Sequence, residues 1–177
     1  MTIQINTPIE IFDDFLSTEQ FDELFNNIKN IDDKFKTYQH TSFLYERIFL
    51  NDYFTDNPIQ ILIRDMLGKL GYNNKNLDIT ITSYQMAQKY DWHDDDDFNR
   101  SHNYILYLTD QEWFKGGELE IKVDGKIETI IPKKNTLVIM DAKLQHRVLP
   151  VQTKIGGMWQ LSRLTLNGHI KIISKYL

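Results

Sequence analysis

Leu77-Asp78-Ile79-Thr80-Ile81 marks the point at which the hydrophobic pattern of this chain changes to a period of two. Successive side chains on an extended strand face opposite sides, so this alternation predicts a strand with one buried face. The strand pattern persists further along the chain, where Val123-Asp124-Gly125-Lys126 predicts a tight hairpin between residues 118–123 and 127–131. Short strands divided by turns favour a two-sheet jelly roll or barrel.

Two amphipathic helices are predicted before this point. Ser17-Thr18-Glu19-Gln20 has the form of a capping box, and apolar residues then recur at helical spacing as far as Ile28. Asn57-Pro58 predicts an N-cap followed by a proline at the first helical position, and Gly71 ends the apolar face that follows. We expect both helices to brace the outside of the sheet. Residues 36–57 are rich in aromatic side chains but have no clean period, so their structure stays open.

Length and composition limit the classes of protein that the chain can represent. We expect a single domain over residues 1–177, with helical and edge-strand support in 1–76 and a jelly-roll core in about 77–170. A net charge of −5 without a basic cluster makes nucleic acid an unlikely partner. The absence of cysteine excludes disulfides and thiolate ligands. Residues 1–10 lack the form of a signal peptide, and no stretch approaches the ~20 apolar residues of a membrane span. We therefore expect a soluble, cytoplasmic protein with no membrane partner.

The residues that carry the most chemistry are in Trp92-His93-Asp94-Asp95 and at His146. On an extended strand His93 and Asp95 reach one ion from the same side, while Asp94 points away. Two imidazoles and one carboxylate leave open positions on ferrous iron, whereas a closed structural zinc site needs a further ligand. A His-x-Asp sequence also arises by chance, usually in a polar loop, so the surrounding residues decide between these interpretations.

The surrounding sequence resembles one family of enzymes. From about Leu77 to Ile170, the order of strand-like and glycine-containing segments around the two histidines is similar to that of the Fe(II)- and 2-oxoglutarate-dependent dioxygenases, specifically the prolyl 4-hydroxylase-like branch. The resemblance implies a mainly β fold with flanking α-helices and a double-stranded β-helix core of the jelly-roll or cupin-like type. It also implies that His93, Asp95 and His146 are the catalytic iron ligands. The matching segments are Tyr104–Leu108, Gly116–Leu119, Leu137–Met140 and Arg163–Gly168.

The same resemblance implies residues that bind the cosubstrate. Arg163 would pair with the distal carboxylate of 2-oxoglutarate, since a planar guanidinium can hold a carboxylate through two hydrogen bonds. Tyr107 would hydrogen-bond this carboxylate and Tyr84 would line the pocket; otherwise each tyrosine is a core aromatic with a satisfied hydroxyl. Arg163 follows His146 by seventeen positions, a longer separation than in many prolyl hydroxylases. Lys154, eight positions beyond His146, is therefore the alternative cation.

For the residues that would contact the substrate, the sequence leaves alternative interpretations open. Arg100 lies where family members have a residue that touches substrate, but it is equally a surface charge paired with the acidic residues 94–97. That acidic run is a solvated loop that leaves the active site, a second metal site, or a group that attracts a cationic substrate. Gly156-Gly157 and Trp159 form either a lid that brings Trp159 against the substrate or a plain hairpin with Trp159 in the core. The remaining histidines have no carboxylate two positions away and are interpreted as non-ligands: His40, His102 and His169.

The activity implied by the resemblance is oxidative. Fe(II), 2-oxoglutarate and O2, with ascorbate as an optional further cofactor, would hydroxylate an unactivated C–H bond and release succinate and CO2. By family analogy the substrate is prolyl, either in a peptide or protein or as a small molecule. The alternatives are a nucleic-acid or other small-molecule oxygenase of the same superfamily, or a non-catalytic jelly-roll module that binds iron and 2-oxoglutarate. The sequence leaves the oligomeric state open.

Overall fold

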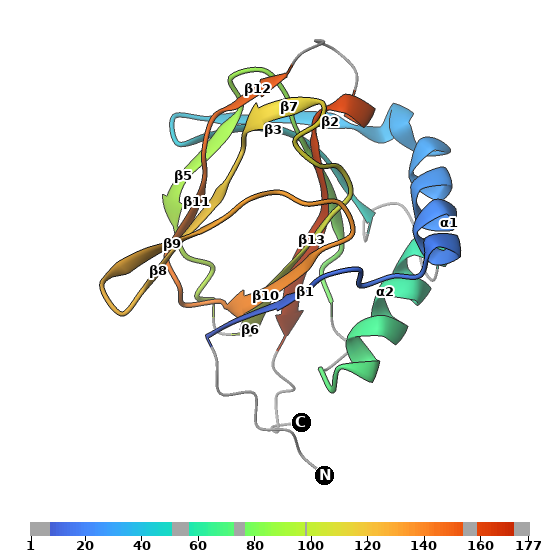
Figure 1. Ribbon diagram of the computed structural model, residues 1–177, viewed down its shortest axis with the longest axis horizontal. Helices are drawn as coiled ribbons and strands as arrows, with labels where there is room; N and C mark the ends of the chain where they lie inside the picture. The colour runs from blue at the N-terminus through green and yellow to red at the C-terminus, as the bar shows by residue number, and fades with distance from the viewer. Residues whose placement is uncertain (1–7, 51–56, 73–76, 98, 154–158, 172–177) are drawn as a thin grey trace.

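A computed structural model describes residues 8–50, 57–72, 77–97, 99–153 and 159–171, without the side chain of Trp159. It shows a curled antiparallel sheet with helices packed against one side (Figure 1). The helical elements of these residues are α1 (Thr18–Lys29), α2 (Pro58–Lys69) and the 3-10 turns η1 (Asp32–Lys34) and η3 (Trp159–Leu161). The strands are β1 (Ile9–Phe12), β2 (Lys36–His40), β3 (Phe43–Phe49), β4 (Thr80–Tyr84), β5 (Lys89–His93), β6 (Arg100–Tyr107), β7 (Phe114–Gly116), β8 (Leu119–Val123), β9 (Lys126–Ile130), β10 (Leu137–Asp141), β11 (His146–Val148), β12 (Val151–Thr153) and β13 (Arg163–Lys171).

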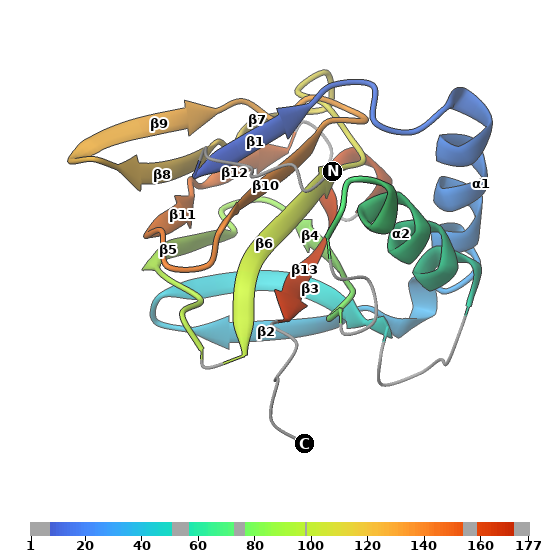
Figure 2. The same ribbon diagram turned by 90° about the horizontal axis from the view of Figure 1, so that it is seen from below.

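The strands of the described residues form one large sheet and one small sheet. The large sheet has the order β1-β10-β6-β13-β4-β3-β5-β11-β8-β9, with β2 paired to β3, while β7 and β12 form the small sheet. Figure 1 looks into the interior of the curl, with β5 and β11 on one side and β13 on the other. The β8–β9 hairpin extends away from the helices (Figure 2). The hairpin predicted around Asp124 and Gly125 is therefore confirmed, with β8 and β9 as its arms.

The alternation that begins at Leu77 separates two environments. Ile81 of β4 and Leu164 and Leu166 of β13 belong to the core between the sheet and the helices, where burial contributes roughly 1.5–3 kcal/mol for each large aliphatic side chain. Thr82 and Thr165 lie on the opposite side of the same strands and line an interior cavity. The polar positions of the period-two pattern therefore face this cavity rather than bulk water, and all of β4 is buried.

Both predicted helices form with the predicted caps. The Ser17 side chain accepts a hydrogen bond from the backbone of Gln20, and Asn57 does the same for Gln60. Gly71 follows α2 with a φ of +88°, a conformation that suits glycine at a helix end. Buried side chains of α1 and α2 join the core on the outer side of β4, β6 and β13, so the expectation that the helices brace the sheet is confirmed.

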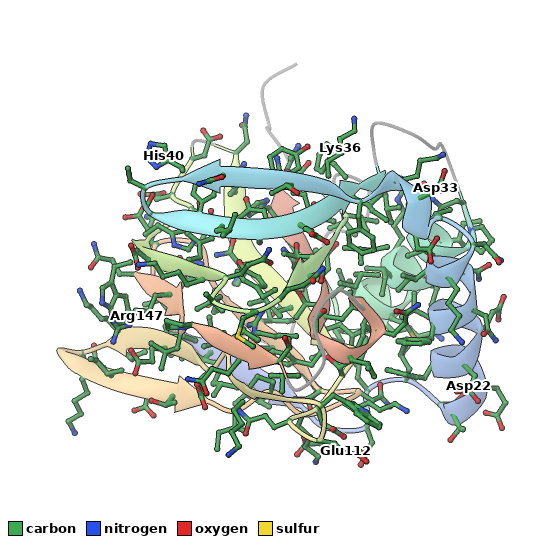
Figure 3. The ribbon with its side chains drawn as sticks, turned by 90° about the horizontal axis from the view of Figure 1, so that it is seen from above. Asp22, Asp33, Lys36, His40, Glu112 and Arg147 are labelled. Carbon is green, nitrogen blue, oxygen red and sulfur yellow. The ribbon has the colours of Figure 1, made fainter. Side chains whose placement is uncertain are left out.

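The aromatic segment that the sequence left open forms a hairpin in its described part. β2 lies at an edge, whereas β3 lies within the sheet because it pairs with β2, β4 and β5. His40 lies at the turn end of this hairpin (Figure 3). No helix among the described residues is long and apolar enough to cross a membrane.

Candidate active site

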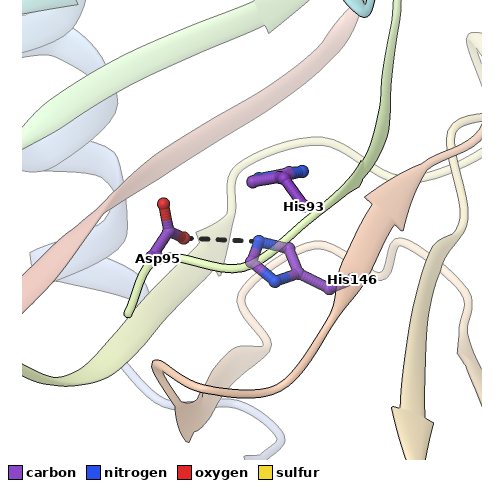
Figure 4. Close-up of side chains that lie close together, drawn as sticks. All are labelled: His93, Asp95 and His146. Atoms are coloured by element: carbon purple, nitrogen blue, oxygen red, sulfur yellow. Dashed lines mark ion pairs between the residues drawn. The ribbon is translucent and has the colours of Figure 1, made fainter. Parts of the chain in front are cut away.

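The structure brings His93, Asp95 and His146 together at one end of the interior cavity. His93 ends β5 and His146 begins β11, and these two strands pair so that the two residues lie directly opposite each other. The backbone N–H of Asp95, just beyond β5, donates to the carbonyl of Ala142 and holds the carboxylate beside them. Donor atoms of the three residues lie within 4.8 Å of one another, and the side chains point toward a common centre (Figure 4).

Both histidines are oriented by the backbone two residues before them, so that each offers the same ring nitrogen. Nδ1 of His93 lies 2.7 Å from the carbonyl oxygen of Asp91, and Nδ1 of His146 lies 2.9 Å from that of Leu144. A carbonyl can only accept, so each Nδ1 carries the proton and each Nε2 keeps a free lone pair. Backbone anchoring of this kind fixes the tautomer and ring orientation of metal-binding histidines. The donor set of two imidazoles and one carboxylate therefore fits ferrous iron.

The protonation states of the site also suit a metal. Burial and the neighbouring His93 lower the pKa of His146 to about 4, so its imidazole is neutral at neutral pH. Burial opposes ionisation of Asp95, but the nearby imidazole of His169 and the electrostatic effect of His146 and His93 outweigh it and lower the pKa of Asp95 to about 2. A neutral imidazole and an ionised carboxylate are the forms that coordinate a divalent ion.

Three neighbouring residues hold Asp95, and two of them, Asn103 and His169, lie outside the predicted site. Asn103 Nδ2 donates to Asp95 Oδ2 at 2.8 Å, while Arg100 Nη1 lies 3.7 Å from Oδ1. His169 Nε2 lies 3.5 Å from the same Oδ1, and its Nδ1 lies 3.4 Å from Asp78 Oδ2, within ion-pair range but outside hydrogen-bond geometry. His169 is not one of the three donors, in agreement with its interpretation as a non-ligand, but it contacts a candidate ligand, which the sequence did not indicate.

Arg163 occupies the other end of the cavity as a buried cation. It is only 2% exposed, and no carboxylate of the described residues forms an ion pair with it. Its Nε donates to the carbonyl of Gly117 at 2.6 Å and its Nη2 to the hydroxyl of Tyr107 at 3.4 Å. Its guanidinium carbon also lies 5.1 Å from the ring centre of Tyr84 and 5.2 Å from that of Tyr107. A buried cation without an acidic partner is energetically unfavourable, and an anionic ligand would compensate its charge.

Tyr107 and Gly117 show how this cation is held. Burial raises the pKa of Tyr107, so the hydroxyl keeps its proton; because it accepts from Arg163, that proton is available for a ligand. Gly117 has a φ of +71°, and a Cβ there would lie 2.6 Å from Arg163 Cδ and 2.9 Å from Val151 Cγ2. Only glycine lets the backbone approach the arginine this closely.

The cavity between these two ends has a volume of about 270 Å³. Its middle is lined by polar side chains of neighbouring strands. Thr82 Oγ1 donates to Asn167 Oδ1 at 2.8 Å, and Thr165 Oγ1 lies 3.2 Å from the same oxygen. One cavity therefore joins a metal-type donor set to a buried cation through a hydrogen-bonding lining, which is the form of a small-molecule site.

The other predicted residues divide into two groups. Arg100 lines the cavity and pairs with Asp95, whereas Asp94, Asp96 and Asp97 are exposed, which favours a solvated loop for them. Residues 154–158, with Lys154 and the two glycines of the suggested lid, lie outside the described residues, as does the side chain of Trp159.

The chain belongs to the 2OG-Fe(II) oxygenase superfamily, because the sequence profile of that family matches residues 79–171, just over half of its length. It is accordingly an oxygenase whose cofactor and cosubstrate are Fe(II) and 2-oxoglutarate, as expected. A comparison with curated proteins gave no match.

Solved structures of prolyl hydroxylases share its fold. A prolyl-4-hydroxylase from Pseudomonas putida has a TM-score of 0.72 at 20% identity, covering 95% of this chain and 94% of that one. A prolyl hydroxylase from Trichoplax adhaerens, in complex with a hypoxia inducible factor oxygen degradation domain peptide fragment, has a TM-score of 0.74 at 14% identity, covering 93% and 84%. A viral collagen prolyl hydroxylase from Paramecium Bursaria Chlorella virus-1, in its 2OG complex, has a TM-score of 0.66 at 20% identity, covering 97% and 99%. Identities this low show the fold alone, and they confirm the expected jelly-roll core.

Proposed function

We propose that this chain is a 2-oxoglutarate-dependent dioxygenase that hydroxylates an unactivated C–H bond, with a prolyl peptide or free prolyl compound as its substrate. The observation that carries the proposal is Arg163, a buried cation without an acidic partner among the described residues, in the cavity that also holds His93, Asp95 and His146. The prolyl substrate is supported only by the fold shared with prolyl hydroxylases.

In this proposal Nε2 of His93, Nε2 of His146 and one oxygen of Asp95 hold the iron. The carbonyls of Asp91 and Leu144 keep the two imidazoles aimed at the same point. Asn103 orients the carboxylate, so the ligand set is arranged before the metal arrives.

At the far end Arg163 pairs with the distal carboxylate of 2-oxoglutarate, and Tyr107 donates its hydroxyl proton to the same group. Tyr84 packs its ring against the guanidinium and limits where the carboxylate can lie. The bound iron and 2-oxoglutarate supply the oxidising power: one oxygen atom of O2 enters the substrate C–H bond and the other enters succinate, with loss of CO2. The buried walls of the cavity exclude water from this chemistry.

We also propose that residues 1–76 and the jelly-roll core at about 77–170 act as one domain. β1 pairs with β10, and β3 pairs with β4 and β5, so strands from both parts share one sheet. The helices complete the core on the outer side of that sheet.

The proposal is tested by succinate release in the presence of Fe(II), 2-oxoglutarate and a set of prolyl peptides. We expect His146→Ala to abolish both Mn(II) binding and succinate release while circular dichroism stays unchanged. The matched control is His40→Ala, because His40 is exposed at the hairpin turn and lies outside the cavity. Succinate release by His146→Ala at the wild-type rate would contradict the ligand assignment. Mn(II) and 2-oxoglutarate binding without any turnover would instead favour a non-catalytic binding module.

A second variant tests the cosubstrate end. Removing one partner of a buried pair costs roughly 3–5 kcal/mol, so Arg163→Gln should raise the 2-oxoglutarate KM by about a hundredfold or more. An unchanged KM in Arg163→Gln, together with a large increase in Lys154→Ala, would transfer the anchoring role to Lys154.

A further inference from the structure

A second cation, Arg47 of β3, lines the cavity and is used by neither the iron ligands nor the cosubstrate anchor. It pairs across the sheet with Thr82, whose side chain also lines the cavity. Its guanidinium carbon lies 4.0 Å from the ring centre of Tyr38 and 5.9 Å from that of Tyr45. Stacking on aromatic rings holds the guanidinium in place while its hydrogen-bond donors stay available.

Arg47 is partly buried, and the buried Nε of its guanidinium lacks a polar partner in the part of the chain that the structure describes. Its Nε is buried and has no hydrogen-bond partner among the described residues, and no carboxylate of those residues forms an ion pair with it. Arg147 shows the contrast, since its Nε donates to Glu120 at 2.6 Å on the surface of β11. A donor buried without a partner destabilises the protein unless a ligand satisfies it.

Arg47 lies on the side of the cavity that leads to the metal ligands. Tyr45 is 5.7 Å from Tyr90 between ring centres, and Tyr90 stacks on His93 at 3.6 Å. Arg100 also lines the cavity, and its Nη1 lies 3.7 Å from Asp95 Oδ1, so both arginines lie around the space beside the metal ligands.

The charged residues that line the cavity also favour an anionic ligand. Apart from histidines, its charged lining residues are Arg47, Arg100, Arg163 and Asp95, an excess of positive charge in a chain whose net charge is −5. The charges of Fe(II) and of doubly ionised 2-oxoglutarate cancel, so loading the site leaves this excess in place. An excess of one sign in a cavity selects a ligand of the opposite sign.

We propose that the substrate of this enzyme is an anion whose carboxylate binds Arg47, with Arg100 as the second cation and the tyrosine rings against its hydrocarbon part. This inference rests on the proposed function and narrows its substrate class. The carboxylate belongs either to a small free acid or to an acidic group of a peptide, and these sources share the same recognition.

The test uses protein loaded with Mn(II) and 2-oxoglutarate, because the paramagnetic ion relaxes the NMR signals of any molecule that binds beside it. The probes are N-acetylproline and hexanoate, each compared with its primary amide, and a peptide with capped ends and one internal glutamate, compared with its glutamine version. We expect the carboxylates to be favoured by about tenfold or more in affinity, equivalent to about 1.4 kcal/mol. Relaxation by the capped glutamate peptide identifies a peptide source, and relaxation by the free acids alone identifies a small-molecule source.

Variants of Arg47 test whether this residue causes the preference for carboxylates over amides. Arg47→Gln should remove the preference for carboxylates, Arg47→Lys should retain most of it, and the control Arg147→Gln should leave it unchanged. Equal relaxation by acids and amides in the wild type overturns the inference, and so does a preference that survives in Arg47→Gln. Loading is measured first in the same samples: failure to bind Mn(II) and 2-oxoglutarate contradicts the proposed function, whereas normal loading without a carboxylate preference contradicts only this inference.

Discussion

Gly117→Ala should damage cosubstrate binding without touching a metal ligand. Gly117 has a φ of +71°, and an added Cβ would lie 2.6 Å from Arg163 Cδ and 2.9 Å from Val151 Cγ2. Its carbonyl also accepts the 2.6 Å hydrogen bond from Arg163 Nε. The added methyl group therefore pushes against Arg163, whose side chain the carbonyl of the same residue holds. Arg163 lines the cavity, so it can move only into the space proposed for 2-oxoglutarate.

Gly125→Ala is the matched control because Gly125 has a φ of +77° and nothing within 4 Å of its added Cβ. Both variants carry the strain of a left-handed alanine, roughly 1–2 kcal/mol. Only Gly117→Ala adds overpacking, typically about 1–3 kcal/mol. Displacing Arg163 also weakens a charge-assisted hydrogen bond worth roughly 1.5–3 kcal/mol, so the 2-oxoglutarate KM should rise about tenfold or more.

The assay combines urea unfolding of both variants with the dependence of succinate release on 2-oxoglutarate concentration. We expect Gly125→Ala to lose a little stability with an unchanged KM. Gly117→Ala should lose about 1–3 kcal/mol more and show the higher KM, with Mn(II) affinity preserved. Equal stability losses and equal KM values in the two variants would refute the idea that the close approach of Gly117 positions Arg163.

Two further predictions concern the neighbours of the metal ligands. Burial opposes ionisation of Asp78, but His169 and Lys171 lower its pKa from 3.8 to about 2, so Asp78 stabilises the fold above its unfolded pKa and loses this effect as the pH falls through the folded value. Asp78→Asn should therefore cost about 2 kcal/mol at neutral pH, and chemical unfolding should show the difference from wild type vanishing between about pH 4 and about pH 2, whereas a constant difference would exclude this cause. His169 is a positioning residue for Asp95, so His169→Ala should weaken Mn(II) binding by about 10–100-fold and His169→Gln should recover part of it. Equal Mn(II) affinities in wild type and His169→Ala, measured by titration without substrate, would leave Asp95 independent of His169.

The donor set is readable from the sequence because its geometry is largely local. His93 and Asp95 are two positions apart on nearly extended backbone, and the second histidine follows in the order that the family uses. Arg163 is also predictable, since it opens the last strand and a cation is needed there. Their roles as ligands and anchor remain predictions, but the structure places all of them around one cavity.

His169 could not be connected to the site by looking for nearby carboxylates in the sequence. Asp78 and Asp95, its two partners, lie far away along the chain and come beside it only in the folded protein. The sequence nevertheless contained an indication that His169 lies near the site. Arg163 and His169 are separated by an even number of positions on one strand, so placing Arg163 in the cavity places His169 on the same face.

Arg47 was hidden for a different reason. Both faces of β3 are covered, with Tyr45 buried on one and Ile48 on the other, so the apolar and polar positions do not alternate cleanly. A strand buried on both faces reads as a run of apolar and aromatic residues rather than as a period of two. The role of Arg47 can be inferred only from the structure, which shows that its buried Nε has no hydrogen-bond partner among the described residues.

The most direct test of the account is the visible absorption of the protein with Fe(II) and 2-oxoglutarate under anaerobic conditions. When 2-oxoglutarate chelates iron held by the protein, a weak charge-transfer band appears that neither component gives alone. We predict this band for the wild type, its loss in His146→Ala, and its recovery in Arg163→Gln only at much higher 2-oxoglutarate concentrations. A folded wild-type protein without the band, or a His146→Ala protein with the band undiminished, would contradict the assignment of His93, Asp95, His146 and Arg163 to one iron and 2-oxoglutarate site.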